Sequence, residues 1–293
     1  MLLYLWKRRA VHTGHFMLLY GGSERIYKDL NGLHHNGYAQ RLPAQVPLQA
    51  WMRHLREGSL PRVYTLDNQG ADELSRWYGL PRGNTNWREK NRTLTPWRLP
   101  HRLRITSAMV PFDLSARRGE IRLIEPGPAQ SLSPEPACSW RSPFRLEATV
   151  EEENGGRIPV FVITDNTFSV TLRDRDDEPK LLFLEADRGS EPDQRSGGIL
   201  GEQSDIARKI IGYSAYAEEG RSLEQFGLRN FRVLFPTTSQ RRMMNLIALA
   251  QSLTSRGLGR FLFTDEATLK SSSEDILNLP WVNARGEEVR LRD

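Results

Sequence analysis

Several features that carry chemistry in other proteins are missing from this sequence. Its 293 residues include one cysteine, Cys138, which excludes an internal disulfide and a multi-cysteine zinc or iron–sulfur site. No apolar run approaches the ~20 residues that a membrane-spanning helix needs. The first residues, MLLYLWKRR, place apolar residues before basic ones, the reverse of a signal peptide. We therefore expect a soluble cytoplasmic protein with no membrane partner.

Histidine is absent from most of the chain. All six histidines lie within the first 101 residues, so we expect neither a histidine-ligated metal centre nor a Ser-His-Asp triad in the second half. The chain also lacks a Gly-rich phosphate loop followed by Lys-Ser or Lys-Thr, which excludes nucleotide hydrolysis by that route.

The charged residues that are present are unevenly distributed. Residues 1–120 contain 19 Lys and Arg against 9 Asp and Glu, whereas residues 121–293 contain 22 against 27. A basic first part is typical of a phosphate-binding module. Clustered carboxylates in the second part are what a cation site requires. The alternative is a solvated surface whose uneven charge has no function.

Residues 1–80 have the pattern of a winged helix-turn-helix domain. The expected elements are helices over 11–20 and 23–36, strands over 38–42 and 62–66, and a helix from residue 68. In this last helix we expect Ala71, Leu74 and Trp77 to face inward.

The helix over 23–36 would be the DNA reader of such a domain. The side chains that it offers to phosphates or base edges are Arg25, Lys28, Asn31 and His35. The alternative is a winged helix that serves protein contacts or dimerisation.

Residues 81–143 are predicted to connect two domains. The basic stretch 81–104 contains Trp87 and Trp97, and its candidate phosphate contacts are Arg88, Lys90 and Arg92. Such a stretch could follow a DNA backbone and stack unpaired bases, or its tryptophans could dock on a neighbouring domain; the pattern does not decide. Residues 121–143 are Pro- and Ser-rich, which predicts a linker.

Residues 144–293 predict a mixed α/β (α+β) domain. The expected strands and helices cover 145–150, 160–164, 168–172, 180–186, 205–218, 231–235, 239–253 and 260–264. The sequence Asp165-Asn166-Thr167 is a turn signal, which predicts a hairpin between 160–164 and 168–172. The strand over 180–186 is almost fully apolar, so we expect it to lie centrally in its sheet.

Three acids follow apolar strand patterns in this domain. Asp165 follows one strand, and Glu185 and Asp187 follow the central one, where a buried charge is costly unless it is paired. Glu185 and Asp187 are two apart and share a face, and Lys209 and Tyr213 share a face of the next helix. Carboxylates suit Mg²⁺ or Mn²⁺, and a lysine can stabilise charge on a phosphate. We predict Asp165 and Glu185 as the first metal ligands and Asp187 as the second choice; the alternative is acids in surface salt bridges.

The order of several short segments resembles that of the replication-relaxation proteins of plasmids and integrating elements, which include relaxases of the MOB-C type. The segments are GLHHNGYAQRL, VYTLDNQGADEL, ITDNTFSV, FLEADRGSEP, ARKIIGYSAY and FRVLFPTTSQRRMMNL. The resemblance covers roughly residues 1–255.

The resemblance implies a DNA-binding winged helix followed by a domain similar to the PD-(D/E)XK restriction-endonuclease fold. It also implies a metal-dependent site made of an acid, an E-x-D pair and a lysine, which fall on Asp165, Glu185 with Asp187, and Lys209. Asp187 stands where the nuclease motif has lysine, and Thr164 where it has proline. Lys209-x-x-x-Tyr213 is similar to the Gln-x-x-x-Tyr of some nucleases of this fold. These departures leave open a member that has lost catalysis.

Together these patterns predict a DNA-binding, metal-dependent endonuclease of the relaxase type, which nicks a plasmid or mobile-element origin for transfer or replication. The expected partners are double-stranded DNA and relaxosome or mobilization proteins, with single-stranded DNA and a homodimer as further candidates. One alternative is an inactive DNA-binding accessory or regulator, and another is a defence or transposition nuclease. A phosphotyrosine intermediate is less favoured, because Tyr213 and Tyr216 lie on a helix with an apolar stripe.

Overall fold

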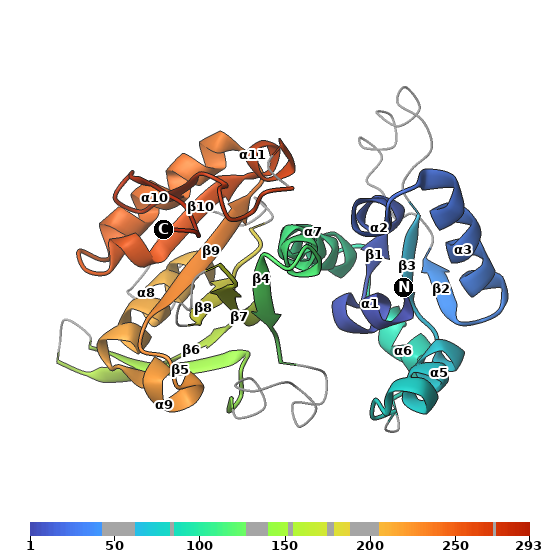
Figure 1. Cartoon of the computed structure of the whole chain (residues 1–293). Coiled ribbons are helices and arrows are strands. Elements are labelled where there is room, and N and C mark those ends of the chain that lie inside the picture. Colours follow the sequence, from blue (N-terminus) through green and yellow to red (C-terminus); the bar gives the residue numbers. More distant parts are fainter. Residues whose placement is uncertain are drawn as a thin grey trace. The chain divides into compact units, whose positions relative to one another are not determined.

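The computed structural model divides into two compact units, Met1–Val110 and Pro111–Asp293 (Figure 1). It describes residues 1–42, 62–82, 85–126, 140–151, 155–174, 179–187, 205–271 and 274–293. Cys138 and the Gly- and Ser-rich loop after Asp187 lie outside this part of the chain. Within it, no helix combines the length and the apolar character needed to cross a membrane.

The division differs from the domain boundaries predicted at residues 80 and 143. The segment 81–143 contains α6 (Trp87–Arg92), α7 (Arg98–Arg117) and β4 (Ile121–Ile124). Helix α6 belongs to the first unit and β4 to the second, and the unit boundary falls within α7. A linker was therefore the wrong prediction for β4, which pairs with a strand of the large sheet.

The first unit combines helices with a small antiparallel sheet. Its first elements are α1 (Leu2–Arg8), β1 (Val11–His12), α2 (Thr13–Tyr20), α3 (Ser23–His35), β2 (Ala39–Leu42), β3 (Val63–Leu66) and α5 (Asn68–Tyr78). The strand order is β1-β3-β2. All of the predicted elements are present, although residues 11–12 form a strand rather than the start of a helix. The winged-helix interpretation itself remains a prediction.

One expected core residue of α5 lies at the surface instead. Ala71 and Leu74 are buried as predicted, but Trp77 is 74% exposed, and its indole N–H donates to Glu73 Oε2 at 2.7 Å. With 3.6 residues per turn, Trp77 lies about 90° from the centre of the face that Ala71 and Leu74 define. The helix also ends one residue later, at Tyr78, so no further turn covers the indole.

A mixed sheet of seven strands forms the second unit. Its strands after β4 are β7 (Asn166–Leu172), β8 (Lys180–Leu184), β9 (Phe231–Thr237), β10 (Phe261–Asp265), β11 (Trp281–Asn283) and β12 (Glu288–Val289). Their order is β12-β11-β10-β9-β8-β7-β4. Strands β8, β9 and β10 are parallel, whereas β7 is antiparallel to both of its neighbours. The mixed α/β architecture is thus confirmed, and β8 lies centrally as expected.

Helices cover this sheet, as Figure 1 shows. They include α8 (Asp205–Glu218), α9 (Arg221–Phe226), α10 (Gln240–Leu253) and α11 (Glu266–Ser271), with a short 3-10 helix at Leu258–Arg260. Leu181 and Phe183 of β8 belong to the same buried cluster as Ile210 of α8 and Leu246 of α10. Burial of such side chains supplies the main favourable free energy of folding.

The hairpin predicted around Asp165 is wrong. β6 (Arg157–Ile163) pairs with β5 (Arg145–Glu151) in a separate two-stranded sheet, whereas β7 pairs with β4 and β8. The backbone N–H of Asp165 donates to the carbonyl of Leu184, so the chain passes at this point from one sheet to the other. A turn signal in sequence does not distinguish a reversal from such a crossing.

Helix α8 packs closely on the two-stranded sheet at Gly212. A Cβ atom at this position would lie 2.4 Å from Val162 Cγ2 and 3.2 Å from Val160 Cγ1. The first distance is far below van der Waals contact, so the glycine is required by the approach of the two elements.

We expect Gly212→Ala to lower the free energy of unfolding by about 1–3 kcal/mol, because the added methyl group overpacks this contact. The matched control is Gly32→Ala in α3, where an added Cβ meets no atom within 4 Å, and which should stabilise the chain by roughly 0.5–1 kcal/mol. Chemical denaturation measures both changes. An unaltered stability of Gly212→Ala would contradict the close packing.

Candidate functional site

The predicted acids meet at one edge of the mixed sheet. Glu185 and Asp187 directly follow β8, and Asp165 directly precedes β7, whose first residue, Asn166, is paired with Leu184 at the end of β8. The backbone N–H of Ala186 donates to Asp165 Oδ2 at 2.8 Å. Because β8 and β9 are parallel, the end of β9 and the start of α10 lie at this same edge.

The two acids after β8 continue its core-facing side. The N–H of Glu185 donates to the carbonyl of Leu234, and that of Asp187 to the carbonyl of Pro236, so the chain stays extended beside β9. Side chains two apart in a strand share a face, which here starts with Leu181 and Phe183 in the core. An apolar face therefore ends in two carboxylates that point toward the covering helices.

Helix α8 binds the first of these carboxylates. Lys209 Nζ donates to Glu185 Oε2 at 2.6 Å, and the hydroxyl of Tyr213 donates to Glu185 Oε1 at 2.5 Å. Glu185 is only 3% exposed, and the Lys209 side chain is 18% exposed. A buried carboxylate is tolerated when it is paired and hydrogen-bonded in this way.

The surroundings shift the pKa values of these groups. Burial raises the pKa of Glu185 to about 7; the charge of Lys209 opposes this rise, and that of Asp165 adds to it. Burial acts to lower the pKa of Lys209, but the carboxylates of Glu185 and Asp165 outweigh it, and the pKa lies above its usual value. Burial raises the pKa of Tyr213 well above its usual value, so this phenol stays protonated as a donor.

Helix α10 binds the second carboxylate through a residue that the sequence patterns did not predict. Arg242 Nε donates to Asp187 Oδ2 at 3.0 Å, and Arg242 Nη2 donates to Asp187 Oδ1 at 3.2 Å. The backbone N–H of Arg242 donates to the side chain of Ser239, the N-cap of α10. A cap directly after a strand, followed by arginine in the first helical turn, was a signal for a cation at this edge.

Polar contacts continue along the edge toward β4. Asn166 Nδ2 donates to Oε1 of Glu125, the residue after β4, at 2.9 Å. Glu125 was also missed, because residues 121–143 had the composition of a linker. The acids at this edge thus come from the ends of three neighbouring strands of the sheet.

The carboxylates at this edge are oxygen donors of the kind that a divalent metal prefers. The residues that the structure describes contain no group of three or more His, Cys, Asp or Glu side chains that could hold a metal ion. Mg²⁺, however, is commonly bound by one or two carboxylates together with water and phosphate. Each carboxylate has about four acceptor positions, so the donors Lys209 and Tyr213 do not fill all of those on Glu185. In donor type, Asp165 and Glu185 suit such an ion.

The predicted DNA contacts of α3 divide into two kinds. The Arg25 side chain is 89% exposed, 3.9 Å from Asp29, and Lys28 is exposed. By contrast, Asn31 Oδ1 accepts from Arg62 Nη1 at 2.9 Å and from the hydroxyl of Tyr64 at 3.4 Å. Asn31 thus joins α3 to the region of β3, and Arg25 and Lys28 are the better placed for phosphates.

His35 is a weaker candidate for a DNA contact. It is exposed at the end of α3, and its ring Nδ1 lies 2.7 Å from the backbone carbonyl oxygen of Asn31. This contact leaves the other ring nitrogen as the polar atom that can reach a phosphate or a base.

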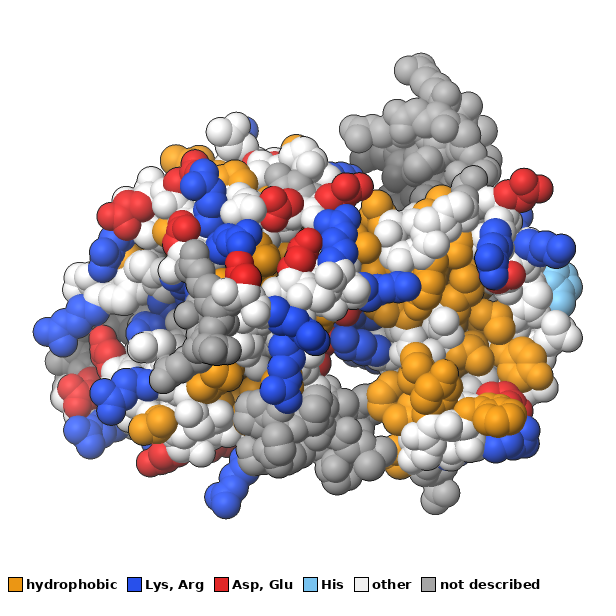
Figure 2. Space-filling view, viewed as in Figure 1, with side chains coloured by type: hydrophobic (Ala, Val, Ile, Leu, Met, Phe, Trp, Pro, Cys, Tyr) orange, Lys and Arg blue, Asp and Glu red, His pale blue; other side chains and the backbone are white. Residues whose placement is uncertain are grey.

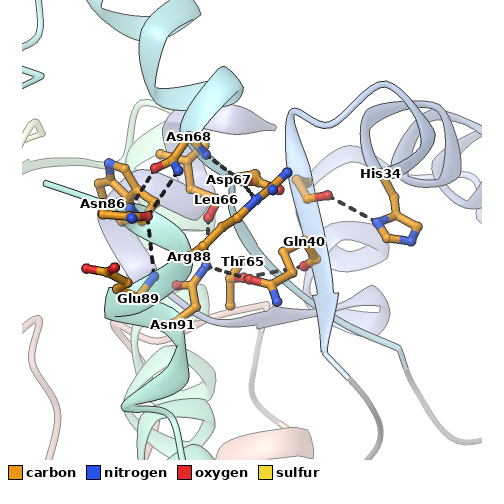
Figure 3. Close-up of polar contacts among 12 residues, drawn as sticks. His34, Gln40, Thr65, Leu66, Asp67, Asn68, Asn86, Arg88, Glu89 and Asn91 are labelled. Atoms are coloured by element: carbon orange, nitrogen blue, oxygen red, sulfur yellow. Dashed lines mark hydrogen bonds and ion pairs between the residues drawn. The ribbon is translucent and has the colours of Figure 1, made fainter.

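A polar network joins helix α6, which carries the other predicted DNA contacts, to the end of β3 and the start of α5 (Figure 3). Asn91 Nδ2 donates to the carbonyl of Leu66 at 2.8 Å, and Arg88 Nε donates to Asp67 Oδ1 at 2.8 Å. The Arg88 side chain nevertheless keeps most of its surface exposed. Arg92 is exposed as well.

The two tryptophans of this region behave differently. Trp87 is buried, with Lys90 Nζ 4.4 Å from the centroid of its ring, so it docks within its unit rather than stacking on bases. Trp97 is 81% exposed. Of the two tryptophans, only Trp97 is exposed and so available for base stacking.

Charges of both signs are interspersed over the second unit on the face drawn in Figure 2. Over the first unit, the same view shows a contiguous hydrophobic area. Among the residues of that unit that the structure describes, the exposed large hydrophobic ones are Leu3, Leu18, Tyr20, Tyr27, Trp77, Tyr78 and Trp97.

A family model described as replication-relaxation matches residues 7–229, which is most of the chain. The chain belongs to the replication-relaxation family. We found no match to it among curated proteins or among solved structures. Membership suggests a role in plasmid replication or mobilization, and hence involvement with DNA.

The match places most of the site within the replication-relaxation region. Asp165, Glu185, Asp187 and Lys209 all lie inside residues 7–229, but Arg242 lies beyond them. The cation that pairs with Asp187 thus comes from a segment that the family model does not cover.

Removing the carboxyl group of Glu185 should alter how stability depends on pH. Its pKa is raised from 4.5 to about 7 in the folded chain, so the folded state holds a proton more tightly than the unfolded state. This contribution to the free energy of unfolding is complete below pH 4.5 and is lost as the pH rises through about 7. In chemical denaturation, the free energy of unfolding of Glu185→Gln should therefore fall less steeply than that of wild type between pH 4.5 and about 7.

Glu24→Gln, at an exposed acid of α3, is the control and should follow the wild-type curve. If the free energy of unfolding depends on pH in the same way for wild type and Glu185→Gln, the pKa of Glu185 is not raised by folding.

Proposed function

We propose that this replication-relaxation protein is a DNA-binding, divalent-metal-dependent endonuclease of the relaxase type, which nicks one strand at a plasmid or mobile-element origin. The observation that carries the proposal is the contact of Lys209 and Tyr213 with buried Glu185, next to Asp165, at one edge of the mixed sheet. Buried titratable groups with shifted pKa values are common at catalytic sites.

Each group of the site has a distinct role in this proposal. Asp165 and Glu185 bind Mg²⁺ or Mn²⁺, which when bound polarises the phosphodiester and lowers the pKa of a coordinated water. Lys209 remains charged because its pKa is raised, and its partly exposed ammonium stabilises the negative charge that develops on the phosphate. Tyr213 donates its hydroxyl hydrogen to Glu185 and thereby orients the carboxylate.

The burial of the two nearby tyrosines supports hydrolysis by water over a covalent phosphotyrosine route. Tyr213 and Tyr216 are both almost fully buried, and their hydroxyls donate to Glu185 and to Gln225. A nucleophilic tyrosine must bring its oxygen to the scissile phosphate, which neither residue can do in this arrangement.

The first unit is proposed to select the DNA. Arg25 and Lys28 project from α3 into solvent, which suits contacts to phosphate groups. Double-stranded DNA with an origin-like site is the proposed substrate, and relaxosome or mobilization proteins are the proposed partners. Single-stranded DNA and a second copy of the chain remain further candidates.

A second candidate function is an inactive DNA-binding accessory or regulator with a nuclease-like domain. The observation that favours it is the engagement of Glu185 and Asp187 by cations of the protein itself. In this candidate, the ion pairs serve only to stabilise the sheet edge.

Plasmid nicking distinguishes the two functions. Wild-type protein with Mg²⁺ or Mn²⁺ should convert supercoiled plasmid carrying its origin to the open-circular form. Asp165→Asn, Glu185→Ala and Lys209→Met should each reduce the rate by about 100-fold or more, because each removes a charge that acts on the phosphate or the ion. Glu147→Ala, at an exposed acid of β5, is the control and should retain the rate. If wild type and Glu185→Ala both bind the DNA and neither nicks it, the protein is an accessory.

The salt dependence of DNA binding tests the role of α3. Replacing both Arg25 and Lys28 by alanine should reduce the slope of log affinity against log salt concentration by about 2, since roughly 0.9 counterion is released per phosphate contact. Lys270→Ala, at an exposed lysine of α11 paired with Glu266, should leave the slope unchanged. An unchanged slope in the double variant would show that α3 does not contact the phosphates.

A further inference from the structure

The two carboxylates at the end of β8 are paired with different helices. Glu185 accepts from Lys209 and Tyr213 of α8, whereas Asp187 accepts from Arg242 of α10. They share one face of an extended segment, which would let both reach one ion. The structure instead gives each its own cation.

Asp187 and Arg242 form a buried ion pair. Both carboxylate oxygens accept from the guanidinium, and the two side chains are only 2% and 10% exposed. Such a two-point contact matches the planar fork of arginine and is directional as well as strong. Ser239, the N-cap of α10, also accepts from the backbone N–H of Arg242. This contact positions the backbone from which the guanidinium extends.

The two carboxylates are bound by different donors. Of the two donors to Glu185, Lys209 is a cation and Tyr213 is a neutral phenol. Both donors to Asp187 belong to the guanidinium cation of Arg242. Asp187 is therefore the less available of the two to a metal ion.

We propose that Arg242 is a positioning residue that holds Asp187 out of the ligand set of the metal, so that the ion binds to Asp165 and Glu185. The proposal rests on the metal site of the proposed function. It also assigns a role to Arg242, which lies outside the matched range 7–229. Through this residue, the segment after β9 determines how many carboxylates coordinate the ion. Without Arg242, Asp187 is a buried carboxylate next to the site and becomes an additional ligand.

Calorimetric titration of the full chain with Mn²⁺, without DNA, tests this inference. Asp165→Asn should weaken binding by about tenfold or more, whereas Asp187→Asn should weaken it less, because it removes no ligand but leaves the positive charge of Arg242 unpaired beside the ion. Arg242→Gln should tighten binding by about tenfold, because the number of charged ligands sets the affinity. Arg242→Lys keeps the positive charge but loses the two-point contact, so its affinity should lie between those of wild type and Arg242→Gln.

The double variant Asp187→Asn with Arg242→Gln should return to the wild-type affinity, and circular dichroism should show that each variant is folded. If the double variant weakens Mn²⁺ binding as much as Asp165→Asn does, Asp187 is a ligand and the inference is overturned, while the proposed metal site stands. If only Arg242→Gln binds Mn²⁺ and wild type does not, the role of Arg242 is supported and the proposed metal dependence fails. Absence of binding by both proteins overturns the inference.

Discussion

The contact between Lys209 and the buried carboxylate of Glu185 is the interaction on which the rest of the site depends. Strand β8 presents an apolar face to the core, and this face ends in a charge that is costly to bury. Helix α8 offsets the cost with an ammonium and a phenol one turn apart. To do so it must pack closely, and Gly212, directly before Tyr213, permits that approach on its other side. The ion pair at this edge therefore depends on the close packing of α8.

Local patterns in the sequence were sufficient to predict the central strand and the helix that faces it. The apolar run over 181–184 and the spacing of Lys209 and Tyr213 are properties of neighbouring residues, and the structure places both as expected. The crossing between β6 and β7 at Asp165 was not predictable in this way, because it depends on which distant strands pair. Arg242 was missed for the same reason: its proximity to Asp187 follows from the parallel pairing of β8 with β9.

In the first unit, residue type alone was a poor basis for predicting which side chains contact DNA. Arg25, Lys28, Asn31 and Arg88 all read as DNA contacts, since each has a polar group suited to phosphate. In the structure, Asn31 joins α3 to Arg62 and Tyr64, and Arg88 joins α6 to Asp67. A polar side chain suited to phosphate can also serve a contact within the unit, as the guanidinium of Arg88 does by donating to Asp67 and the side-chain oxygen of Asn31 does by accepting from Arg62 and Tyr64. Residue type alone does not show these contacts.

The proposed binding of a divalent metal by Asp165 and Glu185 beside Lys209 can be observed in an anomalous difference map from crystals soaked in Mn²⁺. We expect one peak within coordination distance of the carboxylates of Asp165 and Glu185, with Arg242 still paired to Asp187. A map without a peak at this edge, or with the ion on Asp187 in place of Arg242, would contradict it.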